Sequence, residues 1–191
     1  MRNDVSDMLR KAREGDVEAF ASVFEQFRPL LYKIAYRMVG PNECDDVVMD
    51  TYLKVWRAIP EFRGAASLRT WMCRVLKNCA LDYLRRRGRE QARRADDDPR
   101  DDEPLLERIP DSSRPAPDQE AEAHDVGQAL ESALDQLSDQ HRLALLLREV
   151  DGLSYKEVAA ATGVGIGTVM SRIFYAKRHM KRILQHMEVV P

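Results

Sequence analysis

Apolar residues recur at alternating steps of three and four between Val17 and Met38. Because an α-helix has about 3.6 residues per turn, this spacing gathers them on one helical face. Pro29 falls inside the run and predicts either a kink or a division into two helices, since proline lacks the N–H that an interior position donates. Gly40 and Pro41 predict the end of the run. The first part of the chain is therefore expected to be helical.

Two more helices are predicted after this run. The first extends from Glu43 to Ile59, carries carboxylates in its first turn, where the helix dipole favours negative charge, and ends at Pro60. The second begins after Ser67, whose hydroxyl can cap it. Its apolar spacing predicts a buried stripe made of Leu68, Trp71, Val75, Cys79 and Tyr83. Helices that share such faces predict a compact bundle over residues 1–90.

The stretch from residue 91 to residue 123 loses this periodicity. It contains DDDPRDDEP and RPAP and almost no large apolar side chains, which is typical of a flexible linker. Residues 91–125 hold 12 acidic and 5 basic side chains, whereas basic residues outnumber acidic ones by 17 to 13 in residues 1–90 and by 8 to 7 in residues 126–191. The formal net charge of -2 therefore hides two slightly basic ends, and local patches set the affinity for phosphate backbones.

Helical patterning returns over residues 124–191 and contains the sharpest local signal in the chain. Ser154 and Glu157 have the spacing of a capping box, and glycines crowd a predicted turn from Gly163 to Gly167. Thr168 is expected to cap the helix after this turn. The inward residues of that helix would be Val169, Ile173, Ala176 and Met180. This plan matches a helix-turn-helix, although a helical hairpin with a solvated basic face has the same spacing.

The remaining side chains of the helix after the turn are candidates for DNA contact. The front of a recognition helix meets base edges, while cations further along meet phosphate oxygens. The candidates are Met170, Ser171, Arg172, Phe174, Tyr175, Lys177 and Arg178.

A second basic face is predicted on the helix after Ser67. Arg74, Lys77, Asn78 and Arg85 form a stripe distinct from the expected buried one, and Phe62 and Trp71 are possible stacking partners for unpaired bases. An amphipathic helix with its tryptophan in the core and its arginines in water would show the same spacing. The spacing alone leaves both interpretations open.

Acidic residues cluster between Glu43 and Asp50, and Asp46 and Asp50 share a helical face. Metal-dependent hydrolysis is one interpretation, but no histidine lies near them and no second carboxylate pair recurs. Helix capping and a charged contact surface explain the cluster better. The sequence therefore predicts no enzyme, with no catalytic residue, no cofactor and no metal site.

Composition agrees with a mainly helical chain. Charged residues make up 32% of it and aromatic residues 7%, which suits helices with solvated outer faces. The expected fold class is all-α, with an N-terminal helical bundle and a C-terminal helix-turn-helix domain joined by a flexible acidic linker. Cys44, Cys73 and Cys79 contain no CxxC pair and are expected to be small core residues. No apolar run approaches about 20 residues, so a cytoplasmic protein without membrane insertion is expected.

Three segments together closely resemble the extracytoplasmic-function class of bacterial sigma factors. They are ECDDVVMDTYLKVW, FRGAASLRTWMCRVLKNCALDYLRRR and LREVDGLSYKEVAAATGVGIGTVMSRIFYAKRHM. The resemblance implies a non-catalytic subunit that binds core RNA polymerase and directs it to a promoter. It also implies three units: a region 2-like domain over residues 1–90, the acidic linker over 91–123 and a region 4-like domain over 124–191.

The resemblance assigns roles to residues at matching positions. Core polymerase would be bound by Asp46, Asp50, Tyr52, Lys54 and Trp56. The minus-ten element, including an unpaired base, would be bound by Phe62, Arg63, Arg74, Lys77, Asn78, Arg85 and Arg86. The minus-thirty-five duplex would be bound by Thr168 and by the seven candidates between Met170 and Arg178. An anti-sigma factor, linked to the membrane, is the other implied partner.

Some positions depart from the family pattern. Met49 stands where glutamine is usual, Leu68 replaces a common aromatic residue, and Met170 and Tyr175 occupy positions that are often basic. Methionine and tyrosine cannot supply the bidentate bonding to guanine that arginine supplies, so promoter preference does not transfer from the family. A stand-alone helix-turn-helix regulator and a metal-dependent hydrolase remain the alternative functions.

Overall fold

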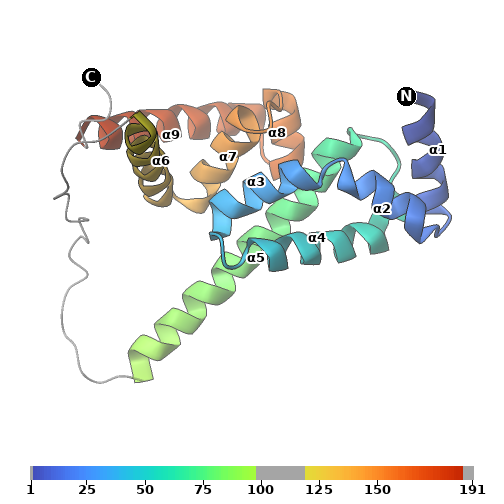
Figure 1. Ribbon diagram of the computed structural model, residues 1–191, viewed down its shortest axis with the longest axis horizontal. Helices are drawn as coiled ribbons and strands as arrows, with labels where there is room; N and C mark the ends of the chain where they lie inside the picture. The colour runs from blue at the N-terminus through green and yellow to red at the C-terminus, as the bar shows by residue number, and fades with distance from the viewer. Residues whose placement is uncertain (1, 98–118, 187–191) are drawn as a thin grey trace.

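The computed structural model describes residues 2–97 and 119–186, and within these ranges every regular element is a helix (Figure 1). The all-α expectation is confirmed. No single helix of the described ranges is long and apolar enough to cross a membrane. Only α8 (Tyr155–Thr162) and α9 (Ile166–His186) taken together reach that length and composition, and a bend of 102° separates them.

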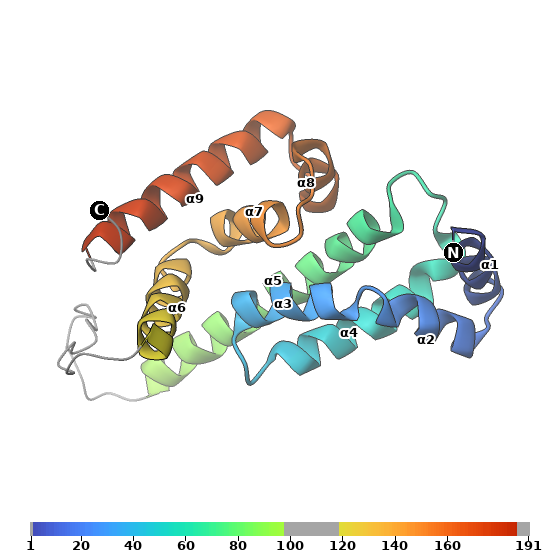
Figure 2. The ribbon, with the colours of Figure 1, turned by 45° about the horizontal axis from the view of Figure 1, so that its top comes forward.

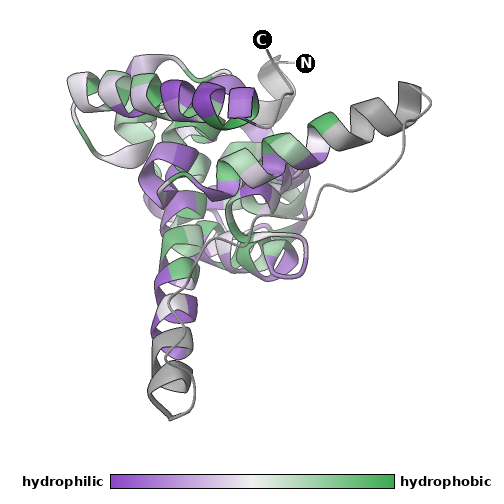
Figure 3. Ribbon diagram, turned by 90° about the vertical axis from the view of Figure 1, so that its left-hand side faces the viewer, coloured by the Kyte–Doolittle hydropathy of each residue, from purple (hydrophilic) through white to green (hydrophobic). Residues whose placement is uncertain are grey.

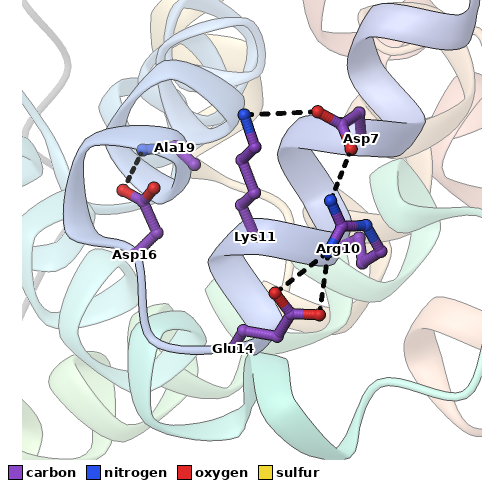
Figure 4. A network of polar contacts seen from close by, with 6 residues as sticks. All are labelled: Asp7, Arg10, Lys11, Glu14, Asp16 and Ala19. Atoms are coloured by element: carbon purple, nitrogen blue, oxygen red, sulfur yellow. Dashed lines mark hydrogen bonds and ion pairs between the residues drawn. The ribbon is translucent and has the colours of Figure 1, made fainter.

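Pro29 divides the long apolar run into two helices. The run forms α2 (Val17–Glu25) and α3 (Arg28–Val39), and Pro29 lies in the first turn of α3, where its missing N–H costs no hydrogen bond. Asp16 caps α2, since its Oδ1 accepts from the N–H of Ala19 at 3.0 Å (Figure 4). Both helices then bury their apolar face in one core.

A further helix, α1 (Arg2–Arg13), precedes this run and was missed by the sequence analysis. Its polar side carries a chain of ion pairs in which Arg10 bridges Asp7 and Glu14 (Figure 4). Exposed pairs of this kind contribute little to stability. Burial of Ala12 and packing of Met8 against the core hold α1 in place.

Two helices complete the N-terminal bundle. α4 (Cys44–Ala58) runs into a short 3-10 helix, η1 (Ile59–Glu61), that contains Pro60. α5 (Leu68–Asp97) then begins at the expected cap, because the N–H of Thr70 donates to Ser67 Oγ at 3.1 Å. α3 and α4 both pack against α5.

The buried face of α5 differs from the expected stripe. Of that stripe only Cys79 is fully buried, whereas Leu68, Trp71, Val75 and Tyr83 are half-buried. The buried residues are Thr70, Met72, Cys73, Leu76, Cys79 and Ala80. The expectation was wrong because α5 is covered from two directions, by α3 and α4 on one side and by α7 (Asp139–Glu149) and α8 on another.

Helices extend into both ends of the segment that the sequence predicted to be a linker. α5 continues to Asp97 and α6 (Gln119–Asp135) begins inside the expected linker, so both ends of residues 91–123 are helical. Loss of apolar periodicity is a poor marker here, because alanine, glutamine, glutamate and arginine favour helix without a buried face. The acidic segment at 98–118 lies outside the described residues.

The C-terminal unit consists of α6, α7 (Asp139–Glu149), α8 (Tyr155–Thr162) and α9 (Ile166–His186). α9 begins two residues before Thr168, so Thr168 lies in its first turn and does not cap it as expected. The four residues predicted to face inward from α9 are all buried. Figure 2 shows α8 close to α5, and the buried side chains of both units form one continuous cluster.

Candidate nucleic-acid interface

The turn between α8 and α9 is built by two local devices. Ser154 N–H donates to Glu157 Oε2 at 2.9 Å, and Glu157 N–H donates to Ser154 Oγ at 3.3 Å, which completes the capping box. The hydrogen bonds from Ser154 lower the pKa of the Glu157 carboxyl. Gly163 ends α8 in the left-handed conformation, with φ of 76°, and its N–H donates to the Ala159 carbonyl at 2.8 Å.

The bend of 102° between α8 and α9 is that of a helix-turn-helix. Val169, Ile173 and Ala176 of α9 face the core and are buried. The opposite face carries the predicted contact residues. Thr168, Met170, Ser171, Phe174, Tyr175, Lys177 and Arg178 are exposed, and Arg172 is half-buried. Seven of the eight predicted residues are therefore accessible on a single helix, and Arg172 lies at the border of its buried face.

Two cations on α9 are held by polar partners on α7. Lys177 Nζ lies 2.8 Å from Glu149 Oε1, and the guanidinium of Arg172 donates to the amide oxygen of Gln140. Further along α9, a hollow of about 840 Å³ opens beside the start of α7 and is lined by Tyr175, Arg178, His179, Lys181 and Arg182 among others. Cations that follow a helix in this way can contact a phosphate backbone.

A different kind of surface lies on α5 and the loop before it. The rings of Phe62 and Trp71 are in contact, with centroids 5.1 Å apart, so the loop folds back over the helix. Arg63, Arg74, Asn78, Arg85 and Arg86 are exposed, and Arg85 lies 3.3 Å from Asp82. Figure 3 shows hydrophilic residues along the part of α5 that projects from the bundle. Aromatic and basic side chains together suit unpaired bases and their phosphates.

Lys77 does not face open solvent as the sequence predicted. Its Nζ donates to the carbonyl of Thr162, the last residue of α8, at 3.3 Å. Burial, followed by the nearby positive charge of Arg74 and Arg85, lowers the pKa of the Lys77 ammonium. One member of the predicted minus-ten set is therefore held by the helix-turn-helix.

Sequence reasoning also missed a polar contact next to Lys77. Arg69 of α5 pairs with Asp151, between α7 and α8, and the thiol of Cys73 donates to Asp151 Oδ2 at 3.1 Å. The buried position of Cys73 and the negative charge of Asp151 raise the pKa of that thiol. No spacing rule connects residues 69 and 151, so the sequence carried no signal for this contact.

The predicted polymerase-binding residues occupy α4. Asp46, Asp50 and Lys54 are exposed. Tyr52 and Trp56 are half-buried, because each packs against the Phe20 ring of α2 with centroids 4.9 Å apart. Two exposed apolar residues on α4, Met49 and Leu53, were not assigned to this surface from sequence. The sequence could have indicated this role, because both residues interrupt an otherwise charged outer face of α4.

Among residues 2–97 and 119–186, no group of three or more His, Cys, Asp or Glu side chains is arranged to hold a metal ion. All three cysteines are free and buried, as expected for core residues. A mostly apolar groove of about 570 Å³ lies between α6, α7 and α9 and includes Leu130, Leu146 and Leu184.

Comparison with known proteins matches both surfaces to one family. The family model for sigma-70 region 2 matches residues 23–90, and the model for sigma-70 region 4 matches residues 127–180. The ECF RNA polymerase sigma factor SigE of Mycolicibacterium smegmatis is 31% identical over 174 residues, covering 89% of this chain and 64% of that protein. The ECF RNA polymerase sigma-E factor of Salmonella typhi is 29% identical over 184 residues, covering 93% of each.

Solved structures show the same fold. The sigma factor RpoE of Bartonella quintana, in complex with the anti-sigma factor NepR, is 26% identical with a TM-score of 0.66, covering 88% of this chain and 98% of that one. CnrH, in complex with the cytosolic domain of CnrY, is 22% identical with a TM-score of 0.68, covering 96% of this chain and 98% of that one.

Proposed function

The chain belongs to the extracytoplasmic-function class of the sigma-70 family, and from that premise we propose that it binds core RNA polymerase and directs promoter-specific initiation of transcription. One observation carries the proposal: a capped helix-turn-helix presents one accessible face of α9 while α5 presents a separate aromatic and basic surface. A promoter offers both duplex and melted DNA, and these two surfaces suit the two forms.

We propose three functional units along the chain. Residues 1–90 are a region 2-like domain, residues 91–123 are the acidic linker, and residues 124–191 are a region 4-like domain. In the first unit, the loop at Phe62 and the exposed cations of α5 capture the minus-ten element as an unpaired strand. In the last unit, α9 enters the major groove of the minus-thirty-five duplex.

Core polymerase is proposed to dock on the outer face of α4. Asp46, Asp50 and Lys54 supply charge, and Met49 and Leu53 add exposed apolar surface between them. Tyr52 and Trp56 contribute from the edge of this face, where their contacts with Phe20 fix their orientation. The role is that of a non-enzymatic subunit, acting in the cytoplasm and without inserting into a membrane itself.

An anti-sigma factor is proposed to restrain the chain. The Bartonella quintana relative is solved as a complex with an anti-sigma factor. For this chain, such a partner would cover the surface on α4 that core polymerase needs, and a membrane link would couple its release to an external signal.

Reconstitution tests the proposal. The full chain is mixed with core polymerase, binding is measured, and run-off transcription on genomic fragments identifies a promoter. We expect binding and selective initiation. A stand-alone helix-turn-helix regulator would instead bind duplex DNA tightly without polymerase, and a chain that fails to bind core contradicts the proposal.

Variants then separate the two DNA surfaces. Arg172→Ala and Tyr175→Ala are expected to weaken use of the upstream element and leave core binding intact. Asn78→Ala and Trp71→Ala are expected to impair melting, and a circular-dichroism melt tells whether Trp71→Ala acts by unfolding the bundle. Arg28→Ala is the control, because Arg28 is an exposed cation of α3 that pairs with the neighbouring carboxylate of Glu25 at 3.5 Å. Normal initiation by all four variants contradicts the site assignment.

A further inference from the structure

The accessible face of α9 is unusually apolar. Ile166, Met170 and Phe174 follow one another at steps of four and are 42%, 53% and 60% exposed. Tyr175, beside them, is 57% exposed and contacts the Phe174 ring edge-on, with centroids 5.5 Å apart. Residues four apart lie next to one another on a helix, so these side chains form a continuous stripe, here called the α9 apolar stripe.

Packing among residues 2–97 and 119–186 does not account for this stripe. The core side of α9 is already filled by Val169, Ile173, Ala176 and Met180. Met170 and Phe174 leave more than half of their surface in water, and neither belongs to the hydrophobic cluster of the molecule. An exposed surface of large apolar side chains marks a place where another molecule binds.

The charges next to the stripe indicate the chemistry of that molecule. Lys177 and Arg178 follow Phe174 by three and four residues and border the stripe on its two sides, whereas Arg172, two residues after Met170, lies on another face of α9. The contacts of Arg172 with Gln140 and of Lys177 with Glu149 hold these two cations toward α7, which packs against α9. The binding partner should therefore be negatively charged at its edges and apolar between them.

Duplex DNA meets this description at one kind of base pair. In the major groove, between two lines of phosphates, the thymine C5-methyl group is the only apolar group on a base edge. Methionine and phenylalanine offer no hydrogen bond to a base edge, but they can bury a methyl group.

We propose that Met170 and Phe174 select promoters by contact with thymine C5-methyl groups in the upstream duplex. This inference rests on the proposed function and specifies it: the element that α9 binds contains thymines at the positions facing Met170 and Phe174, and Lys177 and Arg178 fix the register on the phosphates. The preference for these thymines comes from removing the methyl group from water, which is worth about fourfold in affinity for one buried carbon.

The test uses holoenzyme and a promoter fragment recovered by run-off transcription. Each thymine of the upstream element is replaced in turn by deoxyuridine, which pairs identically and lacks only the C5-methyl. Wild-type holoenzyme is expected to bind about two- to fourfold more weakly at one or two of these positions. Met170→Ala or Phe174→Ala holoenzyme is expected to bind thymine and deoxyuridine duplexes equally there. Val17→Ala, which trims an apolar side chain of 58% exposure on α2, should keep the wild-type difference.

Four other results would contradict this inference. Equal binding of all duplexes by wild-type holoenzyme overturns the inference and leaves the proposed function standing. A deoxyuridine effect that persists unchanged in both variants also overturns it. Loss of core binding by Met170→Ala or Phe174→Ala without DNA assigns the stripe to a protein partner instead. If no fragment supports initiation, the proposed function fails and this inference fails with it.

Discussion

The guanidinium of Arg69 on α5 donates to the main-chain carbonyl of Asp151 and pairs with its carboxylate, and so joins the two halves of the described chain. The Asp151 side chain is fully buried, whereas that of Arg69 is 43% exposed. Lys77, two turns further along α5, makes the next contact through the Thr162 carbonyl. The same helix that is proposed to capture melted DNA therefore supports the helix-turn-helix.

Replacing Arg69 should cost more than replacing an ordinary surface arginine. In Arg69→Met the buried Asp151 carboxylate keeps, among the described residues, only the Cys73 thiol as a side-chain partner, and a buried charge without its counter-ion is costly. Because Arg69 is partly exposed, we expect the free energy of unfolding to fall by about 2 kcal/mol, near the low end for such pairs. Urea unfolding followed by circular dichroism measures it.

Two further variants control this prediction. Arg28→Met removes an exposed pair at 3.5 Å and should change the free energy of unfolding by less than about 1 kcal/mol. Adding Asp151→Asn to Arg69→Met should recover part of the loss, since the amide leaves no buried charge. The prediction is wrong if Arg69→Met is as mild as Arg28→Met.

The Cys73 thiol makes the free energy of unfolding depend on pH in the alkaline range. Its thiol has a pKa above the ordinary value of about 8.5, so the unfolded chain loses this proton before the folded chain does. The stabilisation is complete below that ordinary pKa and is lost as pH rises above it. Between pH 7.5 and 9.5 we expect the free energy of unfolding of the wild-type protein to fall by about 1 kcal/mol more than that of Cys73→Ser. The serine hydroxyl does not titrate in this range and can still donate to Asp151. Urea titrations at both pH values test this, and parallel losses would contradict it.

Local patterns in the sequence predicted local structure well. The capping box at Ser154, the division at Pro29 and the four inward residues of α9 all follow from spacing within one or two helical turns. These features depend on hydrogen bonds and periodicity that neighbouring residues set by themselves. The fold class followed from the same signals.

Contacts between distant segments could not be predicted in this way. The buried face of α5 was misplaced because its second neighbour, α8, is distant in the sequence; Lys77 and Thr162, which join the two helices, are 85 residues apart. The same contact accounts for Lys77, which spacing alone placed in solvent. α1 was missed because it is largely polar and is held by only a few packed residues.

The capping box should stabilise the helix-turn-helix in an acid-sensitive way. Ser154→Ala removes the hydroxyl that accepts from Glu157 N–H, and we expect a loss of about 1 kcal/mol at pH 7. The Glu157 carboxyl has a lowered pKa, so its share of the stabilisation is present above the ordinary glutamate pKa of about 4.3 and is lost as pH falls below it. The difference in the free energy of unfolding between wild type and Ser154→Ala, measured by urea unfolding, should therefore be smaller at pH 3.5 than at pH 7.

Thr168→Ala is the matched control, because Thr168 lies near the start of the next helix, α9. Thr168 was expected to cap α9 but lies inside its first turn, so its removal should change the free energy of unfolding by less than about 0.5 kcal/mol. A loss equal to that of Ser154→Ala would show that Thr168 acts as a cap after all.

Gly163 and Gly165 lie two residues apart in the same turn and provide the sharpest comparison. A Cβ atom at either position would meet nothing within 4 Å, but only Gly163 has a positive φ, of 76°. An L-residue there is strained by roughly 1–2 kcal/mol, so Gly163→Ala should lower the free energy of unfolding by that amount. Gly165→Ala should have little effect, and Gly163→Asn should fall between them because asparagine tolerates the left-handed region. Urea unfolding of the three variants gives the ranking; equal losses at 163 and 165 would mean that space, not backbone conformation, governs this turn.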